Sequence, residues 1–265
     1  MLPIIKRIYI LLVTFGINPI AMWKTVIGIP FFIKDFFVFH VQKYRSNERQ
    51  YFSFGLPFPM LDERFKEGGS ANGHYFHQDL LVAQRIFEIK PITHLDIGSR
   101  VDGFVAHVAS FRKIEVLDLR SIQTEVENIS FKTADLMKVD DTLLNYCDSL
   151  SCLHALEHFG LGRYNDPIKF DGYLDGLDSM HKILKQRGKF FLSVPIGKQR
   201  IEFNAHRIFS MKYLLRLFKD KYFIDYFSYV DDNGDLHKNI EMNNEEIDKN
   251  FDCHYGCAIF EMTKL

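Results

Sequence analysis

The chain has 265 residues, with 33 basic and 34 acidic side chains. This length suits one α/β domain of ordinary size plus an additional segment. The charges nearly cancel, and no basic stripe with interleaved aromatic residues occurs, which argues against a nucleic-acid partner. A hydrophobic fraction of 47% is ordinary for a globular core.

The first 50 residues differ from the rest because residues 8–23 form an uncharged apolar run. A membrane-spanning helix needs about 20 apolar residues, and this run is interrupted by Gly16, Asn18 and Pro19. A basic pair precedes the run, as in a secretory signal, but no small-residue cleavage site follows. We therefore expect neither a spanning helix nor a cleaved signal.

Two interpretations of residues 1–50 stay open. One is a pair of amphipathic helices on a membrane surface, with basic residues at the headgroups and apolar residues below them. The other is a helical cap that packs on the domain or on a dimer partner. We divide the chain into this amphipathic segment, 1–50, and an α/β domain, 51–265, and expect a cytoplasmic protein at the inner face of the membrane.

After a loop-like stretch rich in Pro and Gly, an apolar face of helical period predicts a helix over 78–89. From there strands alternate with helices. We expect strands at 93–98, 114–119, 129–136, 147–156 and 188–196, with helices at 103–111, 171–185 and 209–219. Strands at 222–230 and 255–264 close the chain. The alternation predicts a mostly parallel sheet with right-handed crossovers. We expect the last two strands to pair as an antiparallel hairpin at the edge of this sheet.

The chain has four cysteines, at Cys147, Cys152, Cys253 and Cys257. Their spacings differ from the C-x2-C pairs of common zinc sites. We therefore expect buried free thiols in a reducing compartment and assign no metal ligand. His254, which lies beside two of the cysteines, leaves a metal site as the less favoured alternative.

The first strand ends in Asp96 and turns through Gly98 into a helix, a turn in which a side chain would block the approach of a ligand. Asp102 is the expected N-cap of that helix, whose free N–H groups can hold a carboxylate together with Arg100. Asp118, at the end of the second strand, is placed to accept hydrogen bonds from a ribose diol. A plain strand–turn–helix with a capping Asp is the alternative.

Further polar residues follow the later strands. Asp135 can accept a hydrogen bond from an adenine amino group, or it can cap a turn. Glu157 and His158 follow the fourth strand, at the edge where ligands bind in such sheets. His206 lies in a loop after the fifth strand and has the pKa range of a general base; a packing role is equally open. His154 is a packing histidine on sequence pattern alone.

Several segments together resemble class I S-adenosylmethionine-dependent methyltransferases: LDIGSR, VLDLR, TADL, LEHFG and HRIFS, within residues 75–265. The resemblance implies a Rossmann-like, doubly wound, seven-stranded and mostly parallel sheet with an antiparallel last strand, following an N-terminal helical segment. It implies S-adenosylmethionine as cofactor. The implied cofactor-binding residues are Asp96, Gly98, Arg100, Asp118, Asp135 and His154. The first motif departs from the family pattern, because Arg100 and Asp102 occupy places where glycine is usual.

The DIGSRVDGF turn, the segment 151–172 and the VPIG strand end are similar to an uncharacterised bacterial family associated with surface-polysaccharide biosynthesis. This resemblance implies a sugar acceptor and O-methylation. We expect the acceptor to contact Arg163, Tyr164, Asn165 and Arg207.

For the transfer, the protein must align a hydroxyl with the methyl group, and a base must take its proton. His206 is the first candidate base and His158 the second, with Glu157 as an orienting group or alternative base. Two rival functions are a non-catalytic scaffold of a polysaccharide assembly complex and a nicotinamide enzyme. The second is disfavoured because G-x-G-x-x-G is missing. The sequence identifies neither the acceptor nor the oligomeric state.

Overall fold

The computed structural model describes residues 3–66, 68–121, 123, 125–138 and 140–265. The chain divides into two compact units, Met1–Ser70 and Ala71–Leu265. The boundary lies after Ser70 rather than after residue 50, because residues 51–65 pack on the preceding helix. Each unit is described by itself.

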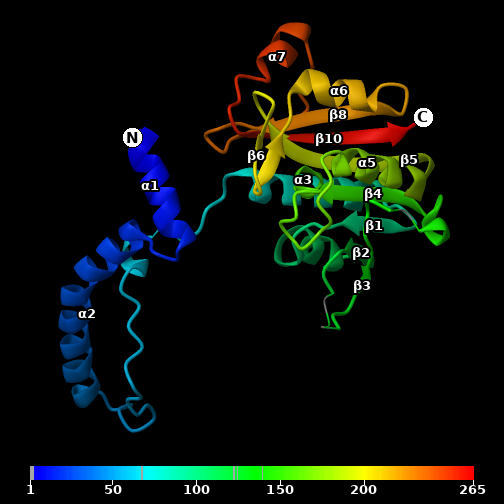
Figure 1. Ribbon diagram of the computed structural model, residues 1–265. Coiled ribbons are helices and arrows are strands. Elements are labelled where there is room, and N and C mark those ends of the chain that lie inside the picture. Colours follow the sequence, from blue (N-terminus) through cyan, green and yellow to red (C-terminus); the bar gives the residue numbers. More distant parts are fainter. Residues whose placement is uncertain (1–2, 67, 122, 124, 139) are drawn as a thin grey trace. The chain divides into compact units, whose positions relative to one another are not determined.

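The first unit consists of two helices, α1 (Pro3–Thr14) and α2 (Pro19–Arg45), and a return segment that ends in the short helix η1 (Glu63–Phe65) (Figure 1). Asn18 caps α2, since its side chain accepts hydrogen bonds from the first turn. The return segment runs along one face of α2. There Gly28 meets the backbone of Leu61 so closely that no side chain would fit, and Asp35 pairs with Arg64.

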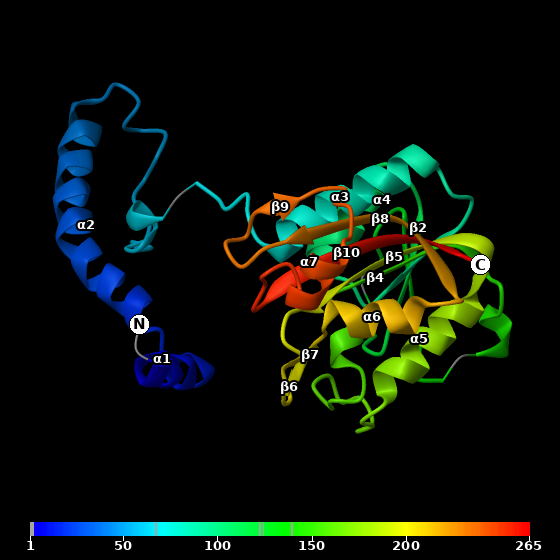
Figure 2. The ribbon, with the colours of Figure 1, turned by 90° about the horizontal axis from the view of Figure 1, so that it is seen from above.

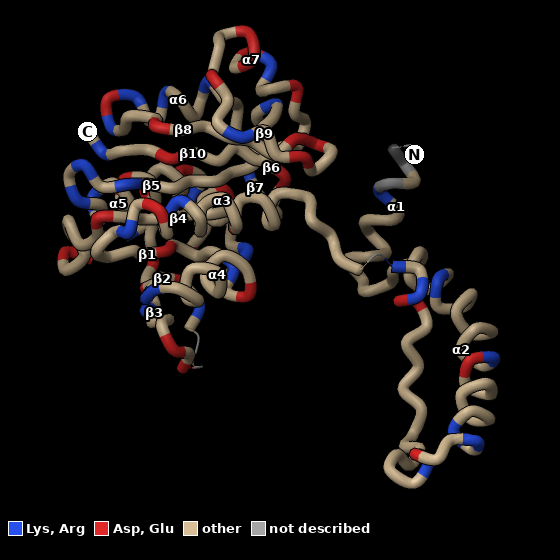
Figure 3. Tube along the Cα trace, turned by 180° about the vertical axis from the view of Figure 1, so that it is seen from behind, with Lys and Arg blue, Asp and Glu red and all other residues tan. Residues whose placement is uncertain are grey.

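The opposite face of α2 is an apolar stripe that remains exposed. Its residues recur at steps of three, four or seven positions, so they share one side of the helix. They are Met22, Val26, Ile29, Ile33, Phe37 and Tyr44. By length and composition α2 could cross a membrane, and only 6% of its most apolar window is buried. Figure 3 shows few charges along this helix.

The second unit is built on an eight-stranded sheet of order β3-β2-β1-β4-β5-β10-β8-β9. The first five strands in this order are parallel, and β10 runs antiparallel to both β5 and β8. The strands are β1 (His94–Ile97), β2 (Ile114–Asp118), β3 (Ile129–Thr133), β4 (Cys147–Leu153), β5 (Leu184–Ile196), β8 (Tyr222–Val230), β9 (Leu236–His237) and β10 (Gly256–Lys264).

Helices cover both faces of this sheet, as Figure 2 shows. One face carries α3 (His74–Ile89), the π-turn η2 (Val101–Val105) and α4 (Ala106–Ala109). The other face carries α5 (Gly172–Ile183) and α6 (Met211–Phe218). Each face has its own apolar cluster, one around Ile86 and Phe104 and the other around Leu177 and Phe218. The central strands are therefore buried on both sides, as parallel strands usually are.

The predicted fold class is confirmed, and so are the four buried free cysteines. One pairing differs from expectation. The last strand, β10, pairs with β8 but does not lie at the edge, because it inserts between β5 and β8. Its residues are almost all buried, and such a strand gains most by packing between two neighbours.

Smaller differences lie at element ends. Helix α3 begins at His74, before the predicted start, with Gly73 at its N-cap. The helix predicted over 103–111 is a π-turn followed by one α-turn, because Gly103 has non-helical dihedral angles. Asp102 does not cap it, since its carboxylate binds Arg100 instead.

The segment predicted as a loop after β5 forms a hairpin, β6 (Arg200–Glu202) and β7 (His206–Ile208). The elements without a sequence prediction also include η1, η3 (Asp141–Leu143), η4 (Leu156–His158), β9 and α7 (Asn244–Lys249).

Candidate active site

A pocket of about 590 Å³ opens at the carboxyl ends of β1, β2, β3 and β4. The strand order reverses between β1 and β4, and this switch point is where ligands bind in doubly wound sheets. This volume includes space that is open to solvent. The wall combines apolar and polar residues, among them Ile97, Gly98, Leu117, Asp118, Leu119, Arg120, Asp135, Leu136, Met137, His154, His158 and Tyr164.

Gly98 forms the turn after β1 as the sequence predicts. Its φ of +65° is a left-handed conformation that favours glycine, and an added Cβ would lie 3.2 Å from the Cβ of Ala155. Its N–H donates to the carbonyl of Leu117, which ties the turn to β2. The pocket floor therefore depends on the absence of a side chain here.

Asp96 lies beneath this turn and does not line the pocket. Its carboxylate accepts hydrogen bonds from the backbone N–H and hydroxyl of Ser99 and from the hydroxyl of Ser151. Burial raises the pKa of Asp96 to about 6. The structure thus gives Asp96 a different place from the predicted cofactor contact: it fixes the shape of the turn from inside.

Arg100 lines a second lobe, which shares Gly98, Asp118 and His154 with the main pocket. Its guanidinium binds Asp102 at 2.9 Å and lies over the ring of Tyr75. The side chain is half exposed, so it can turn toward an anionic ligand group.

Asp118 reaches the pocket from the end of β2, but Arg120 holds it. The backbone N–H of Arg120 and its guanidinium both donate to the Asp118 carboxylate, at 2.8–3.0 Å. The same guanidinium lies 4.5 Å from the ring centre of Tyr164. A ligand with a diol can bind Asp118 once Arg120 turns aside. Asp135 also lines the pocket, and one of its oxygens accepts from the N–H of Met137.

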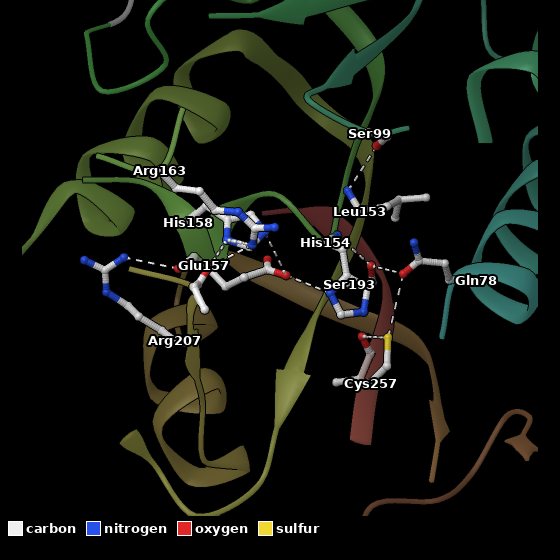
Figure 4. Close-up of polar contacts among 12 residues, drawn as sticks. Gln78, Ser99, Leu153, His154, Glu157, His158, Arg163, Ser193, Arg207 and Cys257 are labelled. Carbon is white, nitrogen blue, oxygen red and sulfur yellow. Dashed lines mark hydrogen bonds and ion pairs between the residues drawn. The ribbon is translucent and has the colours of Figure 1, made fainter. Parts of the chain in front are cut away.

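His154 and Glu157 form a buried pair just after β4 (Figure 4). The Nδ1 of His154 lies 2.7 Å from Glu157 Oε1. Burial opposes charge on both groups. At His154 the neighbouring Cys257 and Glu157 outweigh burial and raise its pKa, and His154 in turn lowers the pKa of Glu157. His154 has a φ of +51°, an uncommon conformation for this residue type, and such strain often accompanies functional sites.

His158 lines the pocket, and its Nε2 lies 3.8 Å from Glu157 Oε1. Its Nδ1 lies 2.7 Å from the carbonyl of Ala205, so the proton of the neutral ring is on Nδ1 and the lone pair is on Nε2. Burial lowers the pKa of His158, against the opposing effect of Glu157. The ring is therefore neutral near pH 7 and can accept a proton there.

His206, the first candidate from sequence, does not line the pocket. It begins β7, where its Nε2 lies 3.2 Å from Glu202 and its ring packs against Tyr255. Burial lowers its pKa as well. The structure thus brings His158, the second candidate, to the cavity and leaves His206 on the neighbouring hairpin.

The predicted acceptor contacts separate into two groups. Tyr164 lines the pocket between the guanidinium groups of Arg120 and Arg163, and Arg163 donates to the carbonyl of Ala205. Asn165, with a φ of +64°, is an exposed turn residue outside the pocket lining.

Arg207 lies outside the pocket lining and is buried. Its guanidinium donates to the carbonyls of Phe159 at 2.7 Å and Phe170 at 2.8 Å, and it lies over the ring of Tyr173. The structure does not bring Arg207 to the pocket, and its predicted contact with the acceptor stays a prediction. It is a positioning residue that holds the loop carrying Tyr164.

Several site residues had no prediction from sequence. Arg120 and Met137 each lie two positions after a predicted contact, Asp118 and Asp135, and this proximity in sequence is the signal that points to them. Tyr75, at the start of α3, lay outside the predicted helix. His74 and Cys257 come close to His154 only through the sheet, and no local pattern reveals that.

Sheet order and pocket define a Rossmann-like α/β protein with a ligand site at the switch point. Residues 100–264 match the family described as "Caenorhabditis protein of unknown function, DUF268". The match spans more than half of the chain, so the chain belongs to this family. Its description does not identify the bacterial polysaccharide-associated family, which stays a prediction. Among curated proteins, none matches the sequence.

Solved structures share the fold at low sequence identity. The cyclase SpnF is 13% identical with a TM-score of 0.50, over 71% of this chain and 80% of that one. A Burkholderia thailandensis 1,6-didemethyltoxoflavin-N1-methyltransferase with bound S-adenosylhomocysteine is 15% identical, with a TM-score of 0.47, over 70% and 78%. The N-methyltransferase NodS from Bradyrhizobium japonicum, also with S-adenosylhomocysteine, is 9% identical, with a TM-score of 0.48, over 72% and 88%. The likeness to SpnF, at a TM-score of 0.50, shows the fold alone, and one fold hosts more than one chemistry.

Proposed function

We propose that the chain is an S-adenosylmethionine-dependent methyltransferase that methylates a hydroxyl of a sugar. The observation that carries the proposal is the pocket at the switch point, where the Gly98 turn, Asp118 and Asp135 converge on one cavity. A glycine turn admits the close approach of a ligand, and a carboxylate at the end of β2 suits a ribose diol.

The chain offers a partner for each part of the cofactor. Asp118 would accept hydrogen bonds from the ribose hydroxyls, and Asp135 from the adenine amino group. Leu136 and Met137 would supply apolar contacts to the base. Arg100 would pair with the carboxylate. The cofactor supplies an activated methyl group, so the remaining task of the protein is alignment and proton removal.

For proton removal we assign His158. It borders the cavity, its Nε2 carries the lone pair, and its pKa is lowered so that the ring stays neutral near pH 7. A sugar acceptor is supported by the ring of Tyr164 at the pocket wall and by the nearby Arg163. Together they offer an apolar face and polar donors, as a sugar ring requires.

The direct test of the transfer uses labelled cofactor with a panel of nucleotide sugars and oligosaccharides. The proposal predicts label in the sugar, as an ether resistant to mild base. Label on nitrogen, or on a small molecule that is not a sugar, would reject the acceptor class while leaving the methyltransferase intact.

The alternative is a non-catalytic scaffold that retains the fold. The observation in its favour is Arg120, which already occupies the Asp118 carboxylate. Thermal melting of the native chain and of Arg120→Ala with S-adenosylhomocysteine separates the two. A cofactor-induced rise in both favours the enzyme. A rise only in the variant means that Arg120 closes the site, as the scaffold requires.

We further propose that the first unit binds an anionic membrane surface from the cytoplasmic side. The exposed stripe of α2 extends over about 33 Å at 1.5 Å per residue, and residues 1–50 carry seven basic but only two acidic residues. Basic charge beside an apolar face is the pattern of interfacial helices. Lys34 and Asp35 at the middle of α2, and the irregular return segment, disfavour a spanning orientation, since hydrocarbon tolerates neither.

A further inference from the structure

Three potential metal ligands from distant parts of the second unit meet beside the pocket. His74 is the first residue of α3, His154 follows β4, and Cys257 is the second residue of β10. Their nearest ligand atoms all lie within 4.8 Å of one another. Cys257 and His154 are buried and His74 is half-buried. Because the three come from separate elements, the sheet itself fixes their proximity.

The second observation is an unsatisfied nitrogen. The side chain of His154 is only 3% exposed, and its Nε2 is buried without a hydrogen-bond partner in the described part of the chain. Leaving a buried polar atom unpaired is costly. The other ring nitrogen, Nδ1, binds Glu157 at 2.7 Å (Figure 4). A carboxylate on one nitrogen and a free second nitrogen is the arrangement in which histidine binds a metal.

The third ligand is held weakly enough to change partner. The Cys257 thiol is a weak donor with a single hydrogen, and Gln78 Oε1 at 3.7 Å and the carbonyl of Ala258 at 3.6 Å are alternative acceptors for it. Figure 4 shows Gln78 and Cys257 on the His154 side of the cluster. On metal binding the thiol and the protonated His154 ring would each release a proton to solvent, and the thiolate and the neutral imidazole would become ligands.

We propose that His74, His154 and Cys257 bind one divalent transition-metal ion, with Zn²⁺ as the natural occupant. Two imidazoles and one thiolate are the nitrogen and sulfur donors that zinc prefers. Three protein ligands leave one position of a tetrahedral ion for water or substrate. Glu157 is a positioning residue that orients His154.

The same residues could instead form a thiol–imidazole–carboxylate group for nucleophilic catalysis. Cys257 is fully buried, so a substrate has no route to its sulfur, whereas a metal ion needs only to pass the half-buried His74. The geometry therefore favours the metal.

His154 also lines the pocket, so the ion lies at its border. Resting on the proposed function, an ion there would bind the acceptor hydroxyl and lower its pKa, which makes proton transfer to a base easier. Metal binding itself does not depend on this consequence.

The test is a Co²⁺ titration of the full chain after metal removal, because Co²⁺ reports thiolate and tetrahedral ligation by its absorption. The proposal predicts about one equivalent bound per chain, with a thiolate charge-transfer band. Cys257→Ser should abolish the band, and His154→Ala should abolish tight binding. Glu157→Gln should weaken binding by about 10–100-fold. Zn²⁺ should displace the cobalt.

Matched controls are Cys253→Ser and His254→Ala, which change a cysteine and a histidine next to β10 but outside the cluster. Both should bind Co²⁺ as the native chain does. Circular dichroism checks each fold. If a buried variant fails to fold, His74→Ala at the half-buried helix start replaces it and should weaken binding at least about tenfold.

A missing charge-transfer band in the native chain would overturn the proposal, as would an unchanged band in Cys257→Ser. Alkylation of Cys257 in the native fold in the presence of excess Zn²⁺ would favour the nucleophile. Calorimetry with S-adenosylhomocysteine on the same metal-free sample tests the cofactor site separately, so either claim can fail alone.

Discussion

The two units of the chain treat their apolar residues in opposite ways. In the second unit, both faces of the sheet are packed under helices, and the strands contribute fully buried residues such as Leu95 and Phe260. In the first unit, α2 has Gly28 as its one described buried residue, while side chains such as Trp23 and Phe37 are about two-thirds exposed. The second unit carries its own core and the pocket, whereas the first leaves most of its described apolar side chains exposed. Localisation and chemistry should therefore be separable by mutation.

The largest effect is expected at the proposed base. His158→Gln removes the Nε2 lone pair, so turnover should fall by about 10²–10⁴-fold, with little change in cofactor affinity or membrane binding. The measurement is single-turnover methyl transfer, with His206→Gln as the matched control. If His206→Gln loses more activity than His158→Gln, the hairpin histidine is the base and our assignment is wrong.

The next effect concerns the glycine turn. Gly98→Val places a β-branched side chain at a positive φ and against Ala155, and we expect affinity for S-adenosylhomocysteine to fall at least about a hundredfold. Gly55→Val, at a glycine with open space around it in the first unit, should leave affinity unchanged. Equal affinities of the two variants would show that the turn does not form the cofactor site.

A third change acts on the first unit alone. Replacing Val26, Ile33 and Phe37 by Asp puts three charges into the stripe, and flotation with anionic liposomes should fall at least about tenfold, since burial of each apolar side chain contributes about 1.5–3 kcal/mol. Cofactor binding should not change. Ile92→Asp, at a residue of the second unit that is 90% exposed, is the control. Flotation that survives the triple substitution would remove the membrane proposal.

A smaller effect is the pH dependence of turnover. Burial lowers the pKa of His158, so the neutral base persists below the usual value of about 6.5. The rate should therefore stay constant from pH 8 to about 6.5 and fall as the ring protonates at lower pH, by about tenfold for each further pH unit. A rate that begins to fall above pH 7 would contradict a neutral His158 base.

The parts of the fold and site that the sequence predicts are those encoded by contiguous residues. The apolar strand before Gly98 and the strand before Asp118 determine where those residues lie, because the ends of parallel strands meet at one edge. The predictions that differ from the structure depend on the direction of a side chain or on contacts between residues far apart in the sequence. Asp96 and Gly98 are two residues apart, yet two serines draw the carboxylate inward. Arg207 is buried because three backbone carbonyls accept its donors. His74 and Cys257 meet only because β10 inserts into the sheet.

The central claim is that the pocket at the switch point binds the cofactor through Asp118. Isothermal calorimetry of the full chain with S-adenosylhomocysteine tests it. The native protein is compared with Asp118→Asn and with the control Asp178→Asn, which changes a half-exposed residue of α5 that pairs with Lys182. A carboxylate that accepts from a diol contributes about 1.5–3 kcal/mol, so Asp118→Asn should lower affinity by about 10–100-fold while Asp178→Asn changes nothing. No binding by the native chain at millimolar ligand, or equal affinity in all three proteins, would contradict the account.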